Sequence, residues 1–169
     1  MNYFELFDFP VSFDLDTGEL SRRYRLLQQQ FHPDRFASSG ERDKLNALQK
    51  TSQINDGFQT LKMPLSRAEH LLGLRGVELA HEQRTLRDPE FLMKQMELRE
   101  ALETIETPEA VLDMDVQLQA EIKTLMDVLH REITANEDES AADTVRKLKF
   151  MHKLRDELER IEDSLMDSW

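Results

Sequence analysis

The sequence predicts an all-α protein in two parts: an N-terminal helical hairpin with short flanking helices, then a C-terminal three-helix bundle. Apolar residues recur at helical spacing along nearly the whole chain, and no segment shows the alternation of a strand. Helix starts are marked repeatedly, either by a polar cap with an acidic residue three positions later or by proline at the first helical position. Glycine and proline each occur only five times in 169 residues, which also favours helix.

The first two helices are predicted from their caps and apolar stripes. Asn2 with Glu5 opens a short helix that carries Tyr3, Phe4, Leu6 and Phe7. Asp16 with Glu19 opens a second helix over residues 17–31. Its apolar stripe consists of Leu20, Tyr24, Leu27 and Phe31.

A third helix is predicted over residues 39–62, with Ser38 as its cap and Glu41 completing the signal. Pro64 must end it, and a short fourth helix follows over residues 65–72. The third helix is expected to turn four apolar side chains inward: Leu48, Ile54, Phe58 and Leu61.

Three long helices are predicted in the second half, over residues 89–105, 108–135 and 140–167. Their start signals are Asp88-Pro89, Thr107-Pro108 and Ser140 with Asp143. The connections between them are short, so neighbouring helices should be antiparallel and form a bundle. Residues 73–87 lack a sustained period and contain two glycines, which predicts a linker, placed at residues 76–88, between domains at 1–75 and 89–169.

The charge distribution also divides the chain. Ten basic residues balance ten acidic ones up to residue 75, so the remainder carries the whole net charge of −12. The net charge of −12 argues against binding to nucleic acid or to anionic membranes. The charge split suggests two modules with different partners. Separately, the chain is expected to be a monomer, with weak self-association at most.

The composition excludes several kinds of chemistry. Without cysteine there is no disulfide, thiolate metal site or cysteine nucleophile, and no cofactor is expected. No apolar run approaches the roughly 20 residues that span a bilayer. The first residues lack the basic and apolar regions of a signal peptide, so a cytoplasmic location is expected.

The most informative motif is His32-Pro33-Asp34, between the second and third helices. Pro33 disfavours helical geometry at the preceding residue, which ends the helix and leaves a polar turn. Away from the apolar stripe, the second helix carries Arg22, Arg23 and Arg25. A basic helix beside a polar turn suits an acidic groove on another protein.

Two other interpretations of this turn remain open. Asp34 and His32 could be a plain cap and a solvated side chain. They could instead belong to a metal site, even that of a metal-dependent hydrolase, but neither His70 nor His81 is well spaced as a further ligand. His130 and His152 lie among charged positions and are expected to be solvated.

Residues 22–27, 31–36 and 54–61 together resemble the J-domain of DnaJ-type co-chaperones, in the same order over about 70 residues. The resemblance implies a protein that is not itself an enzyme. It implies that His32, Pro33 and Asp34 trigger ATP hydrolysis in a DnaK-type chaperone. Arg22, Arg23 and Arg25 would dock on that chaperone.

The helix over residues 89–105 carries apolar side chains on two sides. Phe91, Leu98, Leu102 and Ile105 form one stripe, which suffices for a core. Away from that stripe lie Leu92, Met93, Met96, Glu97 and Glu100, and Phe150 of the last helix could join them. Periodicity leaves two interpretations, a protein-binding face or a surface packed on the rest of the chain.

Residues 64–72, 91–100 and 141–150 resemble the HscB family of J-domain co-chaperones, which act in bacterial iron–sulfur cluster assembly. The resemblance covers the whole chain and implies two partners, the HscA ATPase and the IscU scaffold. Its scaffold-binding positions are Leu92, Met93, Met96, Glu97, Glu100 and Phe150. Met96 stands where leucine is common, and Thr104 replaces a common acidic residue. A J-domain protein with another client remains the alternative.

Overall fold

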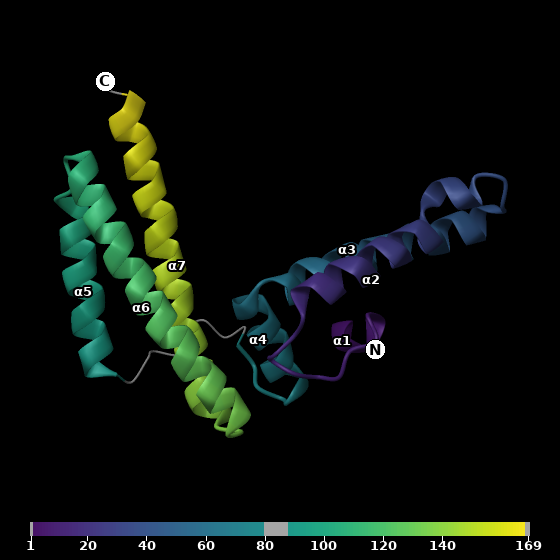
Figure 1. Cartoon of the computed structure of the whole chain (residues 1–169), viewed down its shortest axis with the longest axis horizontal. Helices are drawn as coiled ribbons and strands as arrows, with labels where there is room; N and C mark the ends of the chain where they lie inside the picture. The colour runs from purple at the N-terminus through teal and green to yellow at the C-terminus, as the bar shows by residue number, and fades with distance from the viewer. Residues whose placement is uncertain (1, 80–87, 168–169) are drawn as a thin grey trace. The chain divides into compact units, whose positions relative to one another are not determined.

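The computed structural model describes residues 2–79 and 88–167, and in these ranges every regular element is a helix. The prediction of an all-α fold is confirmed. The chain divides into two compact units, Met1–Gly76 and Val77–Trp169 (Figure 1). None of the described helices is both long and apolar enough to cross a bilayer.

The first unit is built around a helical hairpin. Its elements are α1 (Tyr3–Leu6), α2 (Thr17–Phe31), the 3-10 turn η1 (Pro33–Phe36), α3 (Glu41–Lys62) and α4 (Pro64–Leu74). Helices α2 and α3 run side by side, and η1 lies at the end of the hairpin (Figure 1). The fully buried side chains come from all four helices and the residue after α1: Phe4, Phe7, Leu20, Ile54, Leu61, Leu71 and Leu72.

Helix α1 approaches α3 closely at Gly57. A Cβ atom there would lie 2.9 Å from the ring of Tyr3, 3.1 Å from that of Phe7 and 3.2 Å from Leu6. On the neighbouring face, Tyr24 of α2 stacks on Phe58, with ring centroids 4.0 Å apart. The absence of a side chain at residue 57 is therefore what allows α1 to close the core.

Two arginines fix the segment between α1 and α2. Arg23 donates to the carbonyl oxygens of Phe7 and Asp8, at 2.9 and 2.7 Å. The buried Arg67 donates to the carbonyl oxygens of Phe13 and Leu61, at 3.0 and 3.2 Å. Burial lowers the pKa of Arg67. Because these acceptors are backbone groups, the sequence pattern gave no sign of either contact.

Two expectations about α3 are wrong. The helix begins at Glu41 with Gly40 as its cap, whereas Ser38 was the expected cap. The amide of Ser39 still donates to the Phe36 carbonyl at 3.0 Å, so the chain has not yet left the preceding turn at that point. Leu48, which was expected to face inward, is 54% exposed, and the neighbouring Ala47 is buried instead.

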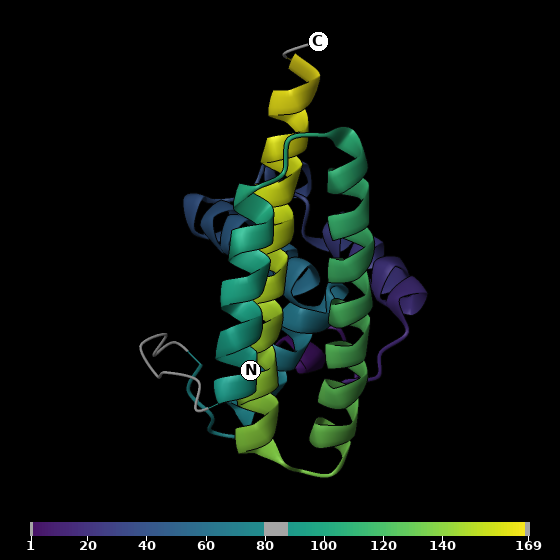
Figure 2. The same ribbon diagram turned by 90° about the vertical axis from the view of Figure 1, so that its left-hand side faces the viewer.

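The second unit consists of α5 (Pro89–Glu103), α6 (Pro108–Thr134) and α7 (Asp138–Asp167). The three helices lie side by side, and a short turn joins α6 to α7 (Figure 2). All three contribute to one core: Phe91, Leu98, Leu102, Val111, Met114, Leu118, Met151, Leu154 and Leu158.

Ion pairs fasten α5 to both other helices. Asp88 caps α5 by accepting from the Phe91 amide at 3.1 Å and also pairs with Lys147 of α7 at 2.8 Å. The bond with Lys147, followed by the one with the Phe91 amide, lowers the pKa of Asp88. Two further pairs join Lys94 to Glu121 at 2.6 Å and Arg99 to Glu157 at 2.7 Å.

Most of the predicted helix starts are confirmed, but that of α7, like that of α3, is wrong. Thr107 caps α6 by accepting from the Ala110 amide, as its position before a proline indicated. Helix α7 begins at Asp138, two residues before the expected start at Ser140. The reason is the preceding turn, where Asn136 adopts a positive φ of 58° and Glu137 donates to the Glu132 carbonyl at 2.9 Å.

Candidate functional site

The turn after α2 presents two polar side chains in a fixed arrangement. His32 has extended geometry (φ −59°, ψ 132°), as expected for a residue before proline. Its Nδ1 accepts a hydrogen bond of 3.2 Å from the Asp34 amide and lies 3.6 Å from the Asp34 carboxylate. The side chains of His32 and Asp34 are 58% and 93% exposed. Because Nδ1 is the acceptor, a neutral imidazole carries its proton on Nε2, which is left for a partner.

Backbone contacts hold this turn at both ends. Pro33 occupies the first position of η1, where its fixed φ is favourable. The Arg35 amide donates to the His32 carbonyl at 3.0 Å. On the other side, the Thr51 hydroxyl of α3 donates to the Phe31 carbonyl at 3.1 Å. The end of α2 is therefore tied to α3.

The three arginines predicted to dock on a chaperone differ in their surroundings. Arg22 is 58% exposed and pairs with Glu19 one turn earlier. Hydrogen bonds from Arg22 and then from Arg23 lower the pKa of Glu19 to about 2. Arg25 is exposed, whereas Arg23 also donates to backbone carbonyls and stacks over Phe9 at 4.1 Å from the ring centroid. Arg22 and Arg25 are thus the accessible members of the set.

Among the described residues, the other histidines do not join His32 and Asp34. His70 lies on α4, where its Nε2 accepts from the Tyr3 amide at 3.2 Å and burial lowers its pKa. His81 lies outside the described residues. In the parts of the chain that the structure describes, no three His, Cys, Asp or Glu side chains are grouped to hold a metal ion. His130 is exposed, but the expectation of a solvated His152 is wrong because that ring is partly buried.

The second unit carries exposed apolar side chains on α5. Leu92, Met93 and Met96 are 43%, 64% and 65% exposed, while Phe91 and Leu98 are buried in the core of the bundle. Helix α5 therefore has two apolar faces, and the described residues leave one of them open.

Four of the six predicted scaffold-binding residues line one groove between α5 and α7. Leu92, Met96, Glu100 and Phe150 surround a volume of about 370 Å³. The Phe150 ring contacts Phe91 edge to face, with centroids 5.9 Å apart, so it is anchored on the core while it lines the groove. Met93 and Glu97 line a second depression on the same helix.

The groove also contains two residues that the sequence analysis missed, Gln95 and Arg99. The Arg99 guanidinium lies 5.7 Å from the centroid of the Phe150 ring and pairs with Glu157. Both residues follow Leu92 at helical spacing, which was the available signal. Arg99 adds a guanidinium and Gln95 adds an amide to the lining of the groove, which also contains the Glu100 carboxylate.

Comparison with known proteins gives consistent results. Residues 87–159 match the family model described as the HSCB C-terminal oligomerisation domain. The "Co-chaperone protein HscB homolog" of Shewanella baltica (strain OS195) is 55% identical, over 99% of this chain and 100% of its own length. Among solved structures, "Chaperone HscB from Vibrio cholerae" matches with a TM-score of 0.86 and 48% identity, covering 98% of this chain and 99% of that one. Human co-chaperone HscB matches with a TM-score of 0.92 and 28% identity, covering 96% and 82%.

Proposed function

Because the chain belongs to the HscB family of co-chaperones, we propose that it stimulates ATP hydrolysis by the chaperone HscA and delivers the iron–sulfur scaffold IscU to it. The observation that carries this proposal is the exposed His32-Pro33-Asp34 turn at the end of the helix that carries the exposed Arg22 and Arg25. The iron–sulfur cluster is cargo of the scaffold in this proposal, and the chain has no cysteine with which to hold it.

The turn acts by binding and not by bond chemistry. The side chains of His32 and Asp34 are accessible, and the contacts from Arg35 and Thr51 fix the backbone that carries them before any partner arrives. A preorganised surface of this kind favours whichever state of an ATPase it contacts best, and so shifts that enzyme toward hydrolysis. The chain itself is therefore not an enzyme in this proposal.

The groove on the second unit would hold the scaffold. Leu92, Met96 and Phe150 offer apolar area, and methionine side chains adapt to the shape of a partner. Glu97 and Glu100 add carboxylates that can select for basic groups at its edge. Carrying the scaffold and the ATPase on one chain makes their encounter effectively intramolecular.

The ATPase half of the proposal is tested with His32→Gln. We expect normal helical content but no stimulation of HscA, because glutamine lacks the ring that presents Nε2. His130→Gln, at an exposed histidine of α6, is the matched control and should stimulate normally. Full stimulation by the His32 variant would show that the turn is not the activating site. DnaK measured in parallel would show whether HscA alone is activated.

The scaffold half is tested by pull-down of IscU with Leu92→Ala, Met93→Ala and Phe150→Ala. We expect each variant to retain less IscU, since each removes apolar area from the exposed surface. Leu112→Ala removes an equally large exposed leucine elsewhere on the bundle and should bind normally. Undiminished binding by all three variants would favour a J-domain protein with another client or another binding face.

A further inference from the structure

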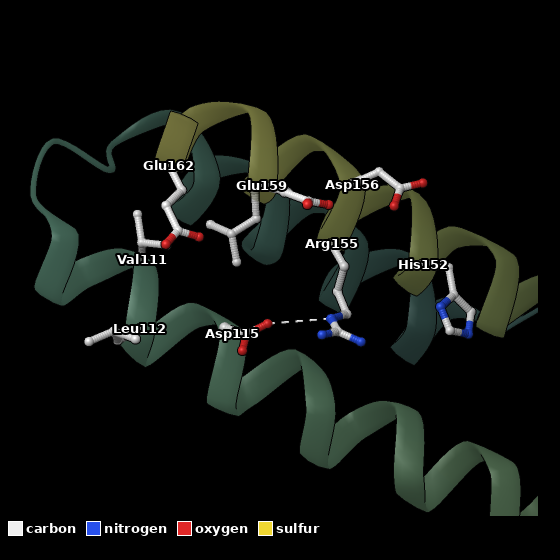
Figure 3. A pocket seen from close by; sticks show the side chains of 9 residues that line it. Val111, Leu112, Asp115, His152, Arg155, Asp156, Glu159 and Glu162 are labelled. Carbon is white, nitrogen blue, oxygen red and sulfur yellow. Dashed lines mark hydrogen bonds and ion pairs between the residues drawn. The ribbon is translucent and has the colours of Figure 1, made fainter. Parts of the chain in front are cut away.

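A further groove of the bundle lies between α6 and α7 and plays no part in the proposed function. It has a volume of about 470 Å³ and shares no lining residue with the groove around Phe150. Val111 and Glu162 lie at one end and His152 at the other, with Asp115 and Arg155 between them (Figure 3).

This α6–α7 groove is acidic. Asp115 of α6 accepts from Arg155 at 3.3 Å and from Gln119 at 2.7 Å, so the arginine's charge is already compensated. The α7 side of the groove carries Asp156, Glu159 and Glu162, which form no ion pair with any described residue. Burial, and then Arg155, lower the pKa of His152 against a smaller opposing effect of Asp156, so this histidine adds little positive charge near neutral pH. The groove therefore has an excess of about three negative charges.

Leu112 lines the same groove, and further exposed apolar side chains follow on each of its two helices. Leu112 and Val116, one turn apart on α6, are 63% and 67% exposed. Met166 is also 63% exposed and follows Glu159 by seven residues on α7, which places both within about 20° of one stripe. Exposed apolar side chains that gather beside a groove are typical of binding sites for other proteins.

We propose that the α6–α7 groove binds a basic amphipathic helix of a partner protein. Its unpaired carboxylates match lysine or arginine on one side of such a helix, and Leu112 with Val116 match apolar residues on the other. The lining residues on α7 run from 152 to 162, a length of about 15 Å, which accommodates roughly three turns of helix.

The proposal is tested with the full chain and two labelled model peptides of about 14 residues. One peptide has leucine at helical spacing and lysine elsewhere, and the other has glutamate in place of every lysine. In fluorescence anisotropy near physiological salt, we expect the lysine peptide to bind and the glutamate peptide not to bind. Equal binding of both peptides would overturn the proposal.

Matched variants separate the groove from the general charge of the protein. Glu159→Lys with Glu162→Lys should weaken binding of the lysine peptide by about tenfold or more, and Leu112→Ser with Val116→Ser should do the same. Glu103→Lys with Asp127→Lys makes the same change in net charge at exposed residues outside the groove, and should change affinity less than about threefold. An equal loss in this control would show binding to bulk charge only and would overturn the proposal.

Two further measurements distinguish other occupants. Leu92→Ala should leave binding of the lysine peptide unchanged, because Leu92 lines the other groove. The peptide result therefore stands or fails independently of the proposed scaffold-binding site. Sedimentation of the chain at increasing concentration should give the same degree of self-association for the parent and for Glu159→Lys with Glu162→Lys. Association lost in that variant would assign the groove to a second copy of the chain, and the partner helix would be the wrong occupant.

Discussion

Gly57 shows how much of the first unit depends on a missing side chain. In the middle of α3, alanine would normally be preferred to glycine by about 1 kcal/mol. The rings of Tyr3 and Phe7 occupy the space that the Cβ atom would need, at 2.9 and 3.1 Å. The contact between two helices therefore outweighs local helix propensity at this residue.

We expect Gly57→Ala to lower the free energy of unfolding by about 1–3 kcal/mol, because the rings must shift to accept the new methyl group. Gly73→Ala on α4 is the control, since nothing lies within 4 Å of its Cβ position; that variant should be neutral or slightly more stable. Urea unfolding followed by circular dichroism measures both. A Gly57 variant as stable as the parent would contradict the close approach of α1.

At the scale of elements, the start of a helix was predictable from the sequence where a side chain near that start caps it. Asp16, Asp88 and Thr107 cap α2, α5 and α6 as expected, because each side chain bonds an amide only three residues away. Ser38 and Ser140 carried similar signals but do not cap, since turns fixed by earlier residues decide where α3 and α7 begin.

The contents of the candidate sites were predictable to different degrees. Helical angles on α5 were enough to separate Leu92, Met93 and Met96 from the core stripe. The α6–α7 groove could not be predicted, because Asp115 and Arg155 are 40 residues apart and meet only through packing. The sequence predicted only a docking role for Arg23. Its hydrogen bond to the Phe7 carbonyl could not be predicted, because a backbone acceptor leaves no pattern in the sequence.

The two faces of α5 should be separable by mutation. Leu98→Ala should destabilise the bundle by about 2–5 kcal/mol, because its side chain is 3% exposed and the variant leaves a cavity. Leu92→Ala, on the 43% exposed face, should change stability by no more than about 0.5 kcal/mol while lowering scaffold binding. Thermal unfolding measures the difference. Similar losses from both variants would mean that Leu92 also belongs to the core.

At the scale of the whole molecule, each unit has a core of its own, and the acidic charge resides in the second unit. The first unit is closed by a contact between residues 67 positions apart in the sequence, in which Nε2 of His70 accepts from the Tyr3 amide. The ring also stacks on Tyr3, with centroids 4.8 Å apart. Protonation of His70 would abolish the acceptor, so this closure is sensitive to pH.

Burial lowers the pKa of His70 below its ordinary value of 6.5, which fixes the direction of the pH effect. As pH falls through 6.5, the unfolded chain takes up the proton before the folded one does, so the free energy of unfolding decreases. The parent should therefore lose more stability than His70→Gln between about pH 7.5 and pH 5.5 in urea unfolding. NMR titration should place His70 below 6.5, and a value at or above 6.5 would contradict this account.

The contact between Tyr3 and His70 also sets an order of events during synthesis. The N-terminal segment is translated first, but its partner on α4 follows 67 residues later. Until α4 has left the ribosome, Phe4 and Phe7 have no closed core to enter and remain exposed on the nascent chain. The first residues made are thus among the last of their unit to find their native contacts, and an early pause in translation would leave them available to other chaperones.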